Sequence, residues 1–465
     1  MSQAWQTFPA TPAWQTADIR VWRGGCQTGT ASLTVQIMTQ TTTIGRGTGT
    51  VTLELCDGVH IEQIPAAAAT SAGGGHDAQA RIVARVAQAL AHPEQFLPLT
   101  DMVVPGDRVA IALDEGLPQP SAILAGILQV LEPCQLSQID VVVPSSTSEQ
   151  AVANLQAALP PEVTVTVHDV ADRAAFGYLG ADDDAEAIRV NRTLVDADLV
   201  LPVSVMRLTD PLLGGPSGDA LYPGMVDVTQ RSRLQRFIAR AIASREDYHD
   251  QRAASQAHQV RWNLGVQLMM AVEVASGGEI GQIFVSSPDK LREFVRTHYA
   301  ANRHRELPEA ADVVVACIEG DGAQQTMENL MRAALAARSY AAPAGTIVLV
   351  STLERLGPLR AADDQVEIGS ELVSDAPKSD SPLPESLSQA EFATRVLHDL
   401  INEIDTSRRY LLMFGGEWEA AEAFGFGVIP DEAALVRLIN QCPHCCVLHA
   451  AQTAANAGSL ALSEA

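Results

Sequence analysis

Apolar and polar residues follow two different periods along the chain, one typical of strands and one typical of helices. Val51 to Leu55 and Val59 to Ile64 alternate as strands do, and Asp57-Gly58 between them is a turn signal. These segments therefore predict a β-hairpin. Further along, Ala78 to Ala91 has apolar residues at helical spacing and is ended by His92-Pro93, which predicts an amphipathic helix.

After this helix the pattern alternates strand with helix, which is typical of α/β proteins with mostly parallel sheets. We expect two α/β domains linked by a helical stretch, Thr229 to Gln259, whose charged residues lie on a solvated helix face. The Arg residues of that stretch are Arg231, Arg233, Arg236 and Arg240. Strands are predicted at 108–113, 139–143, 163–168, 197–205, 281–285, 311–317, 346–350 and 410–414, and helices at 121–131, 149–158, 288–299, 326–337, 389–404 and 432–441.

Changes in composition set the expected boundaries. Residues 1–45 are rich in Thr, Ser, Gln and Gly without sustained periodicity, which predicts a loose leader. Residues 361–386 are acidic and rich in Ser and Pro, which predicts a flexible insertion. We therefore expect an N-terminal α/β domain over 46–259 and a C-terminal α/β domain over 260–465, with the insertion in the second.

The overall charge excludes some classes of partner. Lys and Arg total 31 against 56 Asp and Glu, and the net charge of −25 repels a phosphate backbone, so we expect no nucleic-acid partner. No apolar run reaches the roughly 18 residues of a membrane span, and Met1 to Ala10 lacks the features of a signal peptide. The expected location is cytoplasmic, with no membrane partner.

The seven Cys residues do not form a disulfide framework, because their number is odd and the chain is long. Cys442-Pro443-His444-Cys445-Cys446, followed by His449, offers a pair of thiols at the spacing used for metal or redox chemistry. The other Cys residues are isolated in the sequence. Ordinary packing is therefore favoured, and metal or redox chemistry remains the alternative.

Three passages together resemble the lactate racemase family, over roughly residues 50 to 440. In the first, Asp114 to Pro120 follows a buried strand, as the family's D-x-T-R-P-x-P loop does. The second combines Val190-Asn191-Arg192, Asp196 to Leu201 and a glycine loop, Gly215 to Gly224, and the third combines Glu319-Gly320-Asp321, a helix from Thr326, and Gly345 to Val350.

The resemblance implies a cleft between the two domains, where a nickel-pincer nucleotide lies beside a bound 2-hydroxy acid. The chemistry it implies is racemisation by reversible hydride transfer, which needs a base near neutral pH, a cation for the carboxylate and an anchor for the cofactor. Carried over by position, the expected catalytic residues are Asp114, Thr147, Asn329 and Arg332, and the expected cofactor-binding residues are Gly215, Ser217, Gly218 and Asp219.

Several of these positions depart from the family pattern. Leu117 stands where the family has a substrate-contacting Arg, and Thr147 stands where it has a His, although a hydroxyl is no base near neutral pH. The nickel-ligating His aligns near Asp210 or Pro211, so no metal ligand is predicted. The glycine loop is two residues shorter than usual and lacks the Lys that bonds the cofactor. Asn329 and Arg332 replace a Gln and a Lys and keep the amide and the positive charge.

Two functions follow from the sequence. The first is an isomerase of the lactate racemase type, acting on a 2-hydroxy acid with the nickel-pincer nucleotide that the family implies. The second is a non-catalytic relative that binds a small acid or a protein partner. The residues also leave a purely structural interpretation open, in which the six polar side chains of the predicted site are loop caps and surface groups. These side chains are Asp114, Thr147, Ser217, Asp219, Asn329 and Arg332.

Overall fold

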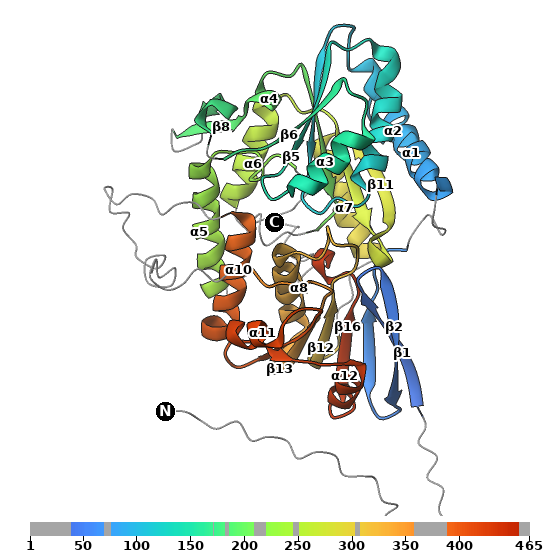
Figure 1. Ribbon diagram of the computed structural model, residues 1–465, viewed down its shortest axis with the longest axis vertical. Helices are drawn as coiled ribbons and strands as arrows, with labels where there is room; N and C mark the ends of the chain where they lie inside the picture. The colour runs from blue at the N-terminus through green and yellow to red at the C-terminus, as the bar shows by residue number, and fades with distance from the viewer. Residues whose placement is uncertain are drawn as a thin grey trace, which may run out of the picture. The chain divides into compact units, whose positions relative to one another are not determined.

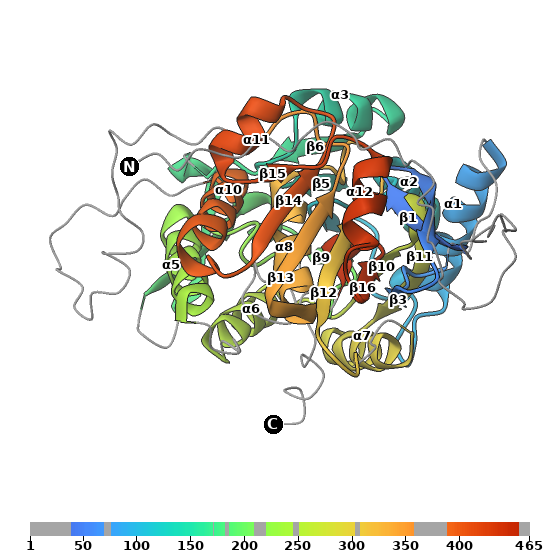
Figure 2. The same cartoon turned by 90° about the horizontal axis from the view of Figure 1, so that it is seen from below.

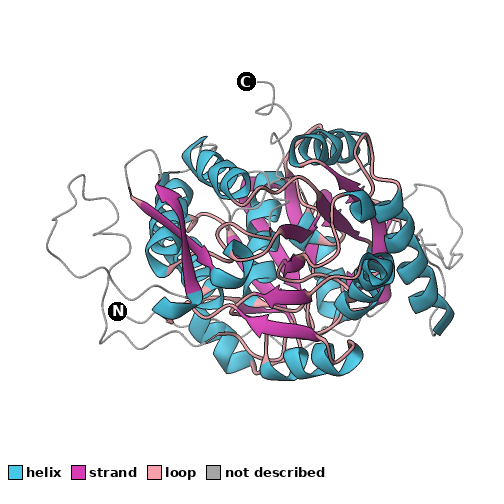
Figure 3. Cartoon of the chain, turned by 90° about the horizontal axis from the view of Figure 1, so that it is seen from above, coloured by secondary structure: helices cyan, strands magenta, loops and turns pink. Residues whose placement is uncertain are grey.

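The computed structural model describes residues 39–68, 76–170, 172–181, 186–208, 220–244, 251–302, 307–357 and 388–454. Within them the chain forms two six-stranded sheets and two hairpins (Figure 1). Helices flank the strands of both sheets (Figure 3). The predicted fold class, α/β with mostly parallel sheets, is confirmed. No helix of the described residues is long and apolar enough to cross a membrane.

The first sheet has the strand order β11-β10-β9-β4-β5-β6, and every neighbouring pair except β10 and β11 is parallel. Its strands are β4 (Arg108–Leu113), β5 (Gln138–Val143), β6 (Val163–Val167), β9 (Leu199–Val205), β10 (Met269–Val274) and β11 (Ile280–Ser286). The helices around it are α1 (His76–Ala91), α2 (Pro120–Leu131), α3 (Glu149–Ala158), α4 (Arg192–Val195), α5 (Val228–Ser244), α6 (Gln251–Asn263) and α7 (Pro288–Asn302). These bounds lie close to the predicted ones where an element was predicted.

The second sheet is parallel throughout, with the order β15-β14-β13-β12-β16-β3. Its strands are β3 (His60–Ile64), β12 (Ala311–Cys317), β13 (Ala341–Val350), β14 (Arg409–Met413), β15 (Gly427–Val428) and β16 (His444–Leu448). Its helices are α8 (Met327–Tyr340), α10 (Gln389–Asp399), which a π-helical turn continues to Ile404, α11 (Trp418–Phe424) and α12 (Glu432–Ile439). Helices α8 and α10 pack together, and α12 lies beside β16 (Figures 1 and 2).

Successive strand residues face different cores, because side chains alternate across a sheet. In β12, Val314 packs with α8 and α10, whereas Val313 and Val315 pack with α12 and the hairpin of β1 (Thr39–Arg46) and β2 (Gly49–Cys56). The second hairpin pairs β7 (Phe176–Ala181) with β8 (Ala187–Asn191). The α8 face of the second sheet and one face of the first share a single apolar cluster.

The predicted N-terminal hairpin is wrong in its pairing. Strand β2 pairs with β1, whereas β3 lies parallel to β16 at the edge of the second sheet. The alternation marks each strand correctly, but it carries no information on a partner nearly four hundred residues away. The predicted leader is also too long, because β1 begins at Thr39 and buries Thr42 and Ile44. The rest of the leader, and the insertion at 361–386, lie outside the described residues.

The predicted helical stretch 229–259 consists of two helices, α5 and α6, and its charges do not all lie on a solvated face. Arg231 is 1% exposed, so that prediction is wrong for this residue. Arg233 is partly exposed and pairs with Glu186 at 3.0 Å. The side chain of Arg240 lies outside the described part of the chain.

The cysteine-rich segment is strand β16, which the sequence pattern did not predict. Cys445 and Cys446 are fully buried on opposite faces of the strand, in different apolar clusters. Burial raises the pKa of both thiols. Since the two side chains point away from each other and are protonated at neutral pH, they act as packing groups, as favoured from the sequence.

The chain does not pass from the first sheet to the second at residue 260. Strands β10 and β11 follow that residue and complete the first sheet, whereas β3 precedes it and belongs to the second. The domains 46–259 and 260–465 therefore stay a prediction about folding units, and residues 39–454 pack as one compact unit where they are described.

Candidate functional site

Asp114 lies directly after β4 and joins the ends of two neighbouring strands. Its Oδ2 accepts hydrogen bonds from the backbone N of Val205 at 2.9 Å and from Nη1 of Arg207 at 3.2 Å, and its Oδ1 accepts from the N of Glu115 at 2.8 Å. Arg207 is 2% exposed and also donates to the backbone O of Glu115 at 3.3 Å. Asp114 therefore fixes the loop after β4 and neutralises a buried guanidinium.

Glu115 projects from this loop into a group of charges supplied by both sheets. Burial and the negative charge of Glu328 raise the pKa of its carboxyl to about 7, against the opposing effects of Arg332, a hydrogen bond with Ser146, and Arg207. Ser146 follows β5, and Glu328 and Arg332 lie on α8. The pKa of this carboxyl group is therefore well above that of an ordinary glutamate.

Arg231 enters the same group from α5. Its Nη2 donates to the backbone O of Gly224 at 3.1 Å and its Nη1 to Oγ of Ser145 at 3.4 Å, while its Nε has no hydrogen-bond partner among the described residues. Burial lowers its pKa to about 10, and the charge of Glu115 opposes that shift. Arg231 is therefore still a cation at neutral pH, and its Nε is a buried donor without an acceptor among the described residues.

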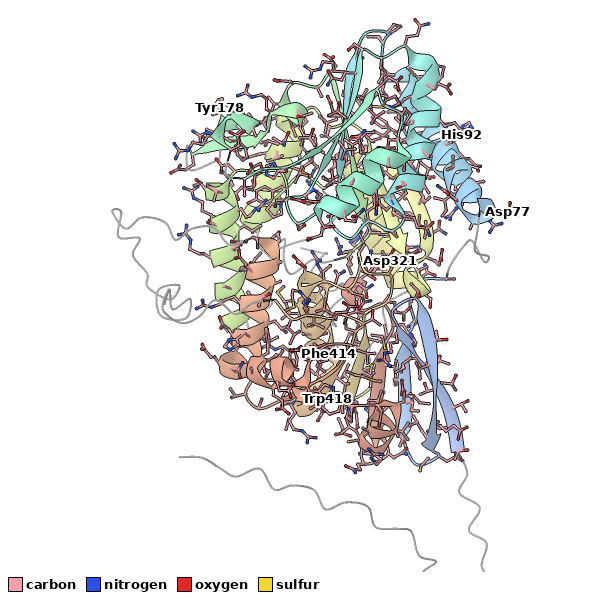
Figure 4. The ribbon with its side chains drawn as sticks, viewed as in Figure 1. Asp77, His92, Tyr178, Asp321, Phe414 and Trp418 are labelled. Atoms are coloured by element: carbon pink, nitrogen blue, oxygen red, sulfur yellow. The ribbon has the colours of Figure 1, made fainter. Side chains whose placement is uncertain are left out.

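The N-terminal half of α8 presents polar side chains to the same place. Asp321, labelled in Figure 4, lies in the preceding loop, and Gln324 of that loop donates to the backbone O of Gly116 beside Glu115. Asn329 donates to the backbone O of Gln324 at 2.8 Å and accepts from Nη1 of Arg332 at 2.9 Å. These bonds hold the start of α8 against the loop after β4.

Of the predicted catalytic residues, Asp114, Asn329 and Arg332 are brought to one place, around Glu115. Thr147 is half-buried, and its backbone N bonds to the O of Pro144 at 3.0 Å, but it is the neighbouring Ser146 whose side chain bonds Glu115. The predicted cofactor-binding residues Gly215, Ser217, Gly218 and Asp219, together with Asp210 and Pro211, lie outside the described residues.

Leu117, which replaces the family's Arg, packs in the core of the first sheet at 5% exposure. An apolar side chain at that position is therefore a packing residue. The cations of the site come from other elements, namely Arg207 after β9, Arg231 on α5 and Arg332 on α8.

Sequence reasoning missed Glu115, Arg207, Arg231 and Glu328. For Arg231 a signal was present, since it lies three and seven residues before Leu234 and Ile238, on the buried face of α5. An Arg on such a face needs a buried partner. For Glu115 no local signal exists, because its raised pKa arises from burial and from the charge of Glu328, which lies far away in the sequence.

A second buried carboxylate, Glu319, joins the ends of β12 and β16 to the turn after β10. It is fully buried, and its oxygens accept hydrogen bonds from Gly277 N at 2.8 Å, Ser276 Oγ at 3.2 Å, His449 Nδ1 at 3.0 Å and Ala450 N at 3.2 Å. Burial alone would raise the pKa of Glu319, but these bonds outweigh it and hold the pKa below its usual value. Glu319 is therefore a structural anion.

The fold and this arrangement of charges define an α/β protein with a polar site where the ends of two mostly parallel sheets meet. Residues 49–207 match the family model described as the lactate racemase N-terminal domain. The resemblance to the lactate racemase family seen in the sequence is therefore confirmed over this part of the chain. A search of curated proteins finds no match.

Two solved structures resemble the fold of this chain over most of its length. The lactate racemase apoprotein from Thermoanaerobacterium thermosaccharolyticum has a TM-score of 0.64 at 13% identity, over 90% of this chain and 99% of that one. A protein from Thermotoga maritima has a TM-score of 0.53 at 11% identity, over 76% of this chain and 92% of that one. At these identities the likeness concerns the fold.

Proposed function

We propose that this chain binds a small carboxylic acid of the 2-hydroxy acid class at the site around Glu115. The observation that carries the proposal is that two buried cations, Arg231 and Arg332, lie near the same carboxyl group although they belong to different elements. A negative group of the ligand would take the place of that carboxyl group as their partner. A surface-facing Arg pair would be solvated, but these two are at most 5% exposed.

The site also offers a hydrogen-bond acceptor for the hydroxyl group of such an acid. Glu328 is 2% exposed, and its Oε1 has no hydrogen-bond partner among the described residues. A buried acceptor without a donor costs about 1–3 kcal/mol. A ligand hydroxyl at this atom supplies the missing donor, while the carboxylate of the same ligand accepts from Nε of Arg231.

Replacement of Arg332 by Gln tests this proposal. We expect the Kd for lactate, measured by titration calorimetry, to rise about 10- to 100-fold, because a charge-assisted hydrogen bond contributes about 1.5–3 kcal/mol. Arg395→Gln is the control, since Arg395 is a partly exposed residue of α10 that pairs with Asp399. Equal Kd values in the two variants would argue against a ligand carboxylate at Arg332.

The resemblance also implies a nickel-pincer nucleotide anchored on a Lys, and the residues present do not fit one held in that way. The chain has two Lys residues. Lys290 lies exposed on α7 and pairs with Glu293 at 2.9 Å, and Lys378 lies outside the described residues. The segment 209–219, which contains the predicted cofactor loop, has neither Lys nor His in its sequence.

The described residues also do not fit the nickel ion of this cofactor. The described residues contain no group of three or more His, Cys, Asp and Glu side chains that could hold a metal ion. His168, near Arg231, is fully buried; its Nε2 lies 3.2 Å from the O of Val226 and its Nδ1 3.3 Å from the amide of Asn191. Burial, helped by the charge of Arg231, lowers its pKa to about 4. We therefore derive no step through this cofactor.

Racemisation of the bound hydroxy acid is the second candidate function, favoured by the Asn329–Arg332 pair, which keeps the amide and cation of the family. We expect protein coexpressed with cofactor-making enzymes to carry less than stoichiometric nickel by elemental analysis and no pyridinium adduct by mass spectrometry. One equivalent of nickel, together with loss of optical purity of lactate, would instead support the racemase.

A further inference from the structure

A pocket of about 290 Å³ lies between α1 and the outer edge of the first sheet, and none of its lining residues belongs to the site around Glu115. Helix α1 lies beside β11, the edge strand of that sheet (Figure 1). His92, labelled in Figure 4, follows the last turn of α1 and lines the pocket. The polar side chains of the lining are Arg85, Gln88, His92, Glu94 and Gln282.

Arg85 brings a positive charge to this pocket without a carboxylate opposite it. Its Nη2 donates to the backbone O of Gly281, whereas its Nη1 is buried and has no hydrogen-bond partner among the described residues. Burial lowers the pKa of the guanidinium, and no carboxylate of the described residues opposes that shift. An Arg side chain nevertheless stays a cation in a protein, and a buried donor without an acceptor is costly. Nη1 therefore calls for an anionic acceptor from outside the chain.

The edge strand adds a backbone donor and a backbone acceptor. The O of Val285 accepts a hydrogen bond from the N of Glu94 at 2.9 Å, so the backbone groups of Val285 point away from β10. Ile283, which also lines the pocket, lies two residues earlier in the same strand and turns its N–H and its O to the same side. No strand of the described residues covers this side of β11. Both groups of Ile283 are therefore directed at the space beside the strand.

Glu94 brings a negative charge to the same pocket. Its backbone is fixed against β11, because its N donates to Val285 and its O accepts from Oγ of Ser286 at 2.8 Å. Its carboxylate and the guanidinium of Arg85 line one pocket, yet they do not pair with each other. Glu94 also follows the end of α1 closely, where the helix dipole is negative. The pocket therefore has a positive and a negative group that are separate.

From this geometry we propose that the pocket binds a small zwitterion of the amino-acid class. The ligand carboxylate accepts from Nη1 of Arg85 and from the N–H of Ile283, and the ammonium group donates to the O of Ile283 and faces Glu94. An anion such as phosphate fits less well, because Glu94 and the end of α1 repel it. This inference goes beyond the proposed function, since it concerns a different site and a different class of ligand.

Titration calorimetry with L-alanine tests the site. We expect L-alanine to bind to the unmodified protein, and N-acetyl-L-alanine and L-alaninamide to bind at least about tenfold more weakly, because each lacks one of the two charges. Saturating lactate should leave the Kd for L-alanine unchanged, and so should Arg332→Gln, because both act at the site around Glu115.

Two variants assign the charges of the pocket. Arg85→Gln is expected to raise the Kd for L-alanine about 10- to 100-fold. Arg81→Gln is its control, since Arg81 is exposed on the same helix and does not line the pocket. Glu94→Gln is expected to raise the Kd about two- to fivefold, because Glu94 is exposed. Thermal unfolding of the variants, followed by circular dichroism, checks that they are folded.

The inference is overturned if L-alanine does not bind, if folded Arg85→Gln and Glu94→Gln bind it as the unmodified protein does, or if N-acetyl-L-alanine binds equally well. Binding that is lost in Arg332→Gln but kept in Arg85→Gln would place L-alanine at the site around Glu115 and overturn it too. Lactate binding is measured separately, so the proposed function stands or fails by itself.

Discussion

Replacement of Glu319 by Ala is expected to lower the free energy of unfolding by about 3–5 kcal/mol. The change removes a fully buried carboxylate that accepts four hydrogen bonds and leaves the backbone N–H groups of Gly277 and Ala450 without their acceptor. Urea unfolding followed by circular dichroism measures the difference. Glu419→Ala, on the exposed surface of α11, is the control and should change stability by less than about 0.5 kcal/mol.

The stabilisation by Glu319 also depends on pH. Because folding lowers its pKa, the contribution is fully present above the pKa of a glutamate in the unfolded chain and is lost as the pH falls through the lower, folded value. The gap in stability between the unmodified protein and Glu319→Ala should therefore narrow in acid. A gap that stayed constant down to acid unfolding would show that Glu319 acts by packing alone.

Replacement of Asp114 by Ala is expected to have the second largest effect, a loss of about 2–4 kcal/mol in stability together with loss of lactate binding. Three hydrogen bonds disappear, and Arg207, at 2% exposure, loses the carboxylate opposite it. The loop that carries Glu115 loses its fixed position as well. Calorimetric titration with lactate and urea unfolding measure the two effects.

Asp114→Asn is the matched variant, because it keeps the shape of the side chain and removes its charge. We expect it to lose less stability than Asp114→Ala, since an amide oxygen still accepts one backbone N–H. If both variants bound lactate as the unmodified protein does, Asp114 would not position the site.

The strands and helices were predictable where burial requires a regular pattern of apolar residues. Strands such as β4 and β12 are buried on both faces and appear as short continuous apolar runs, so their positions follow directly from the sequence. Strand β16 has the same burial but is built partly from His444, Cys445 and Cys446, whose residue types are also those of metal ligands, so its sequence does not by itself indicate a strand.

The site was less predictable than the fold, for a physical reason. Asp114, Asn329 and Arg332 were found through their place in family motifs, whereas the properties of Glu115 arise from groups brought to it by folding. The elevated pKa depends on burial and on Glu328, which lies on the other sheet's helix. The sequence shows Glu115 as one of many acidic residues, and its pKa is shifted only because folding brings a distant segment next to it.

The pairing of β3 with β16 has a consequence for how the protein is made. Strand β3 is synthesised early, but its only neighbour in the sheet is the last strand of the described chain. During translation the backbone donors and acceptors of β3 stay without their partners in the sheet until β16 has left the ribosome. Such a late closure favours slow folding and leaves an unpaired strand open to association with other chains until β16 has been made.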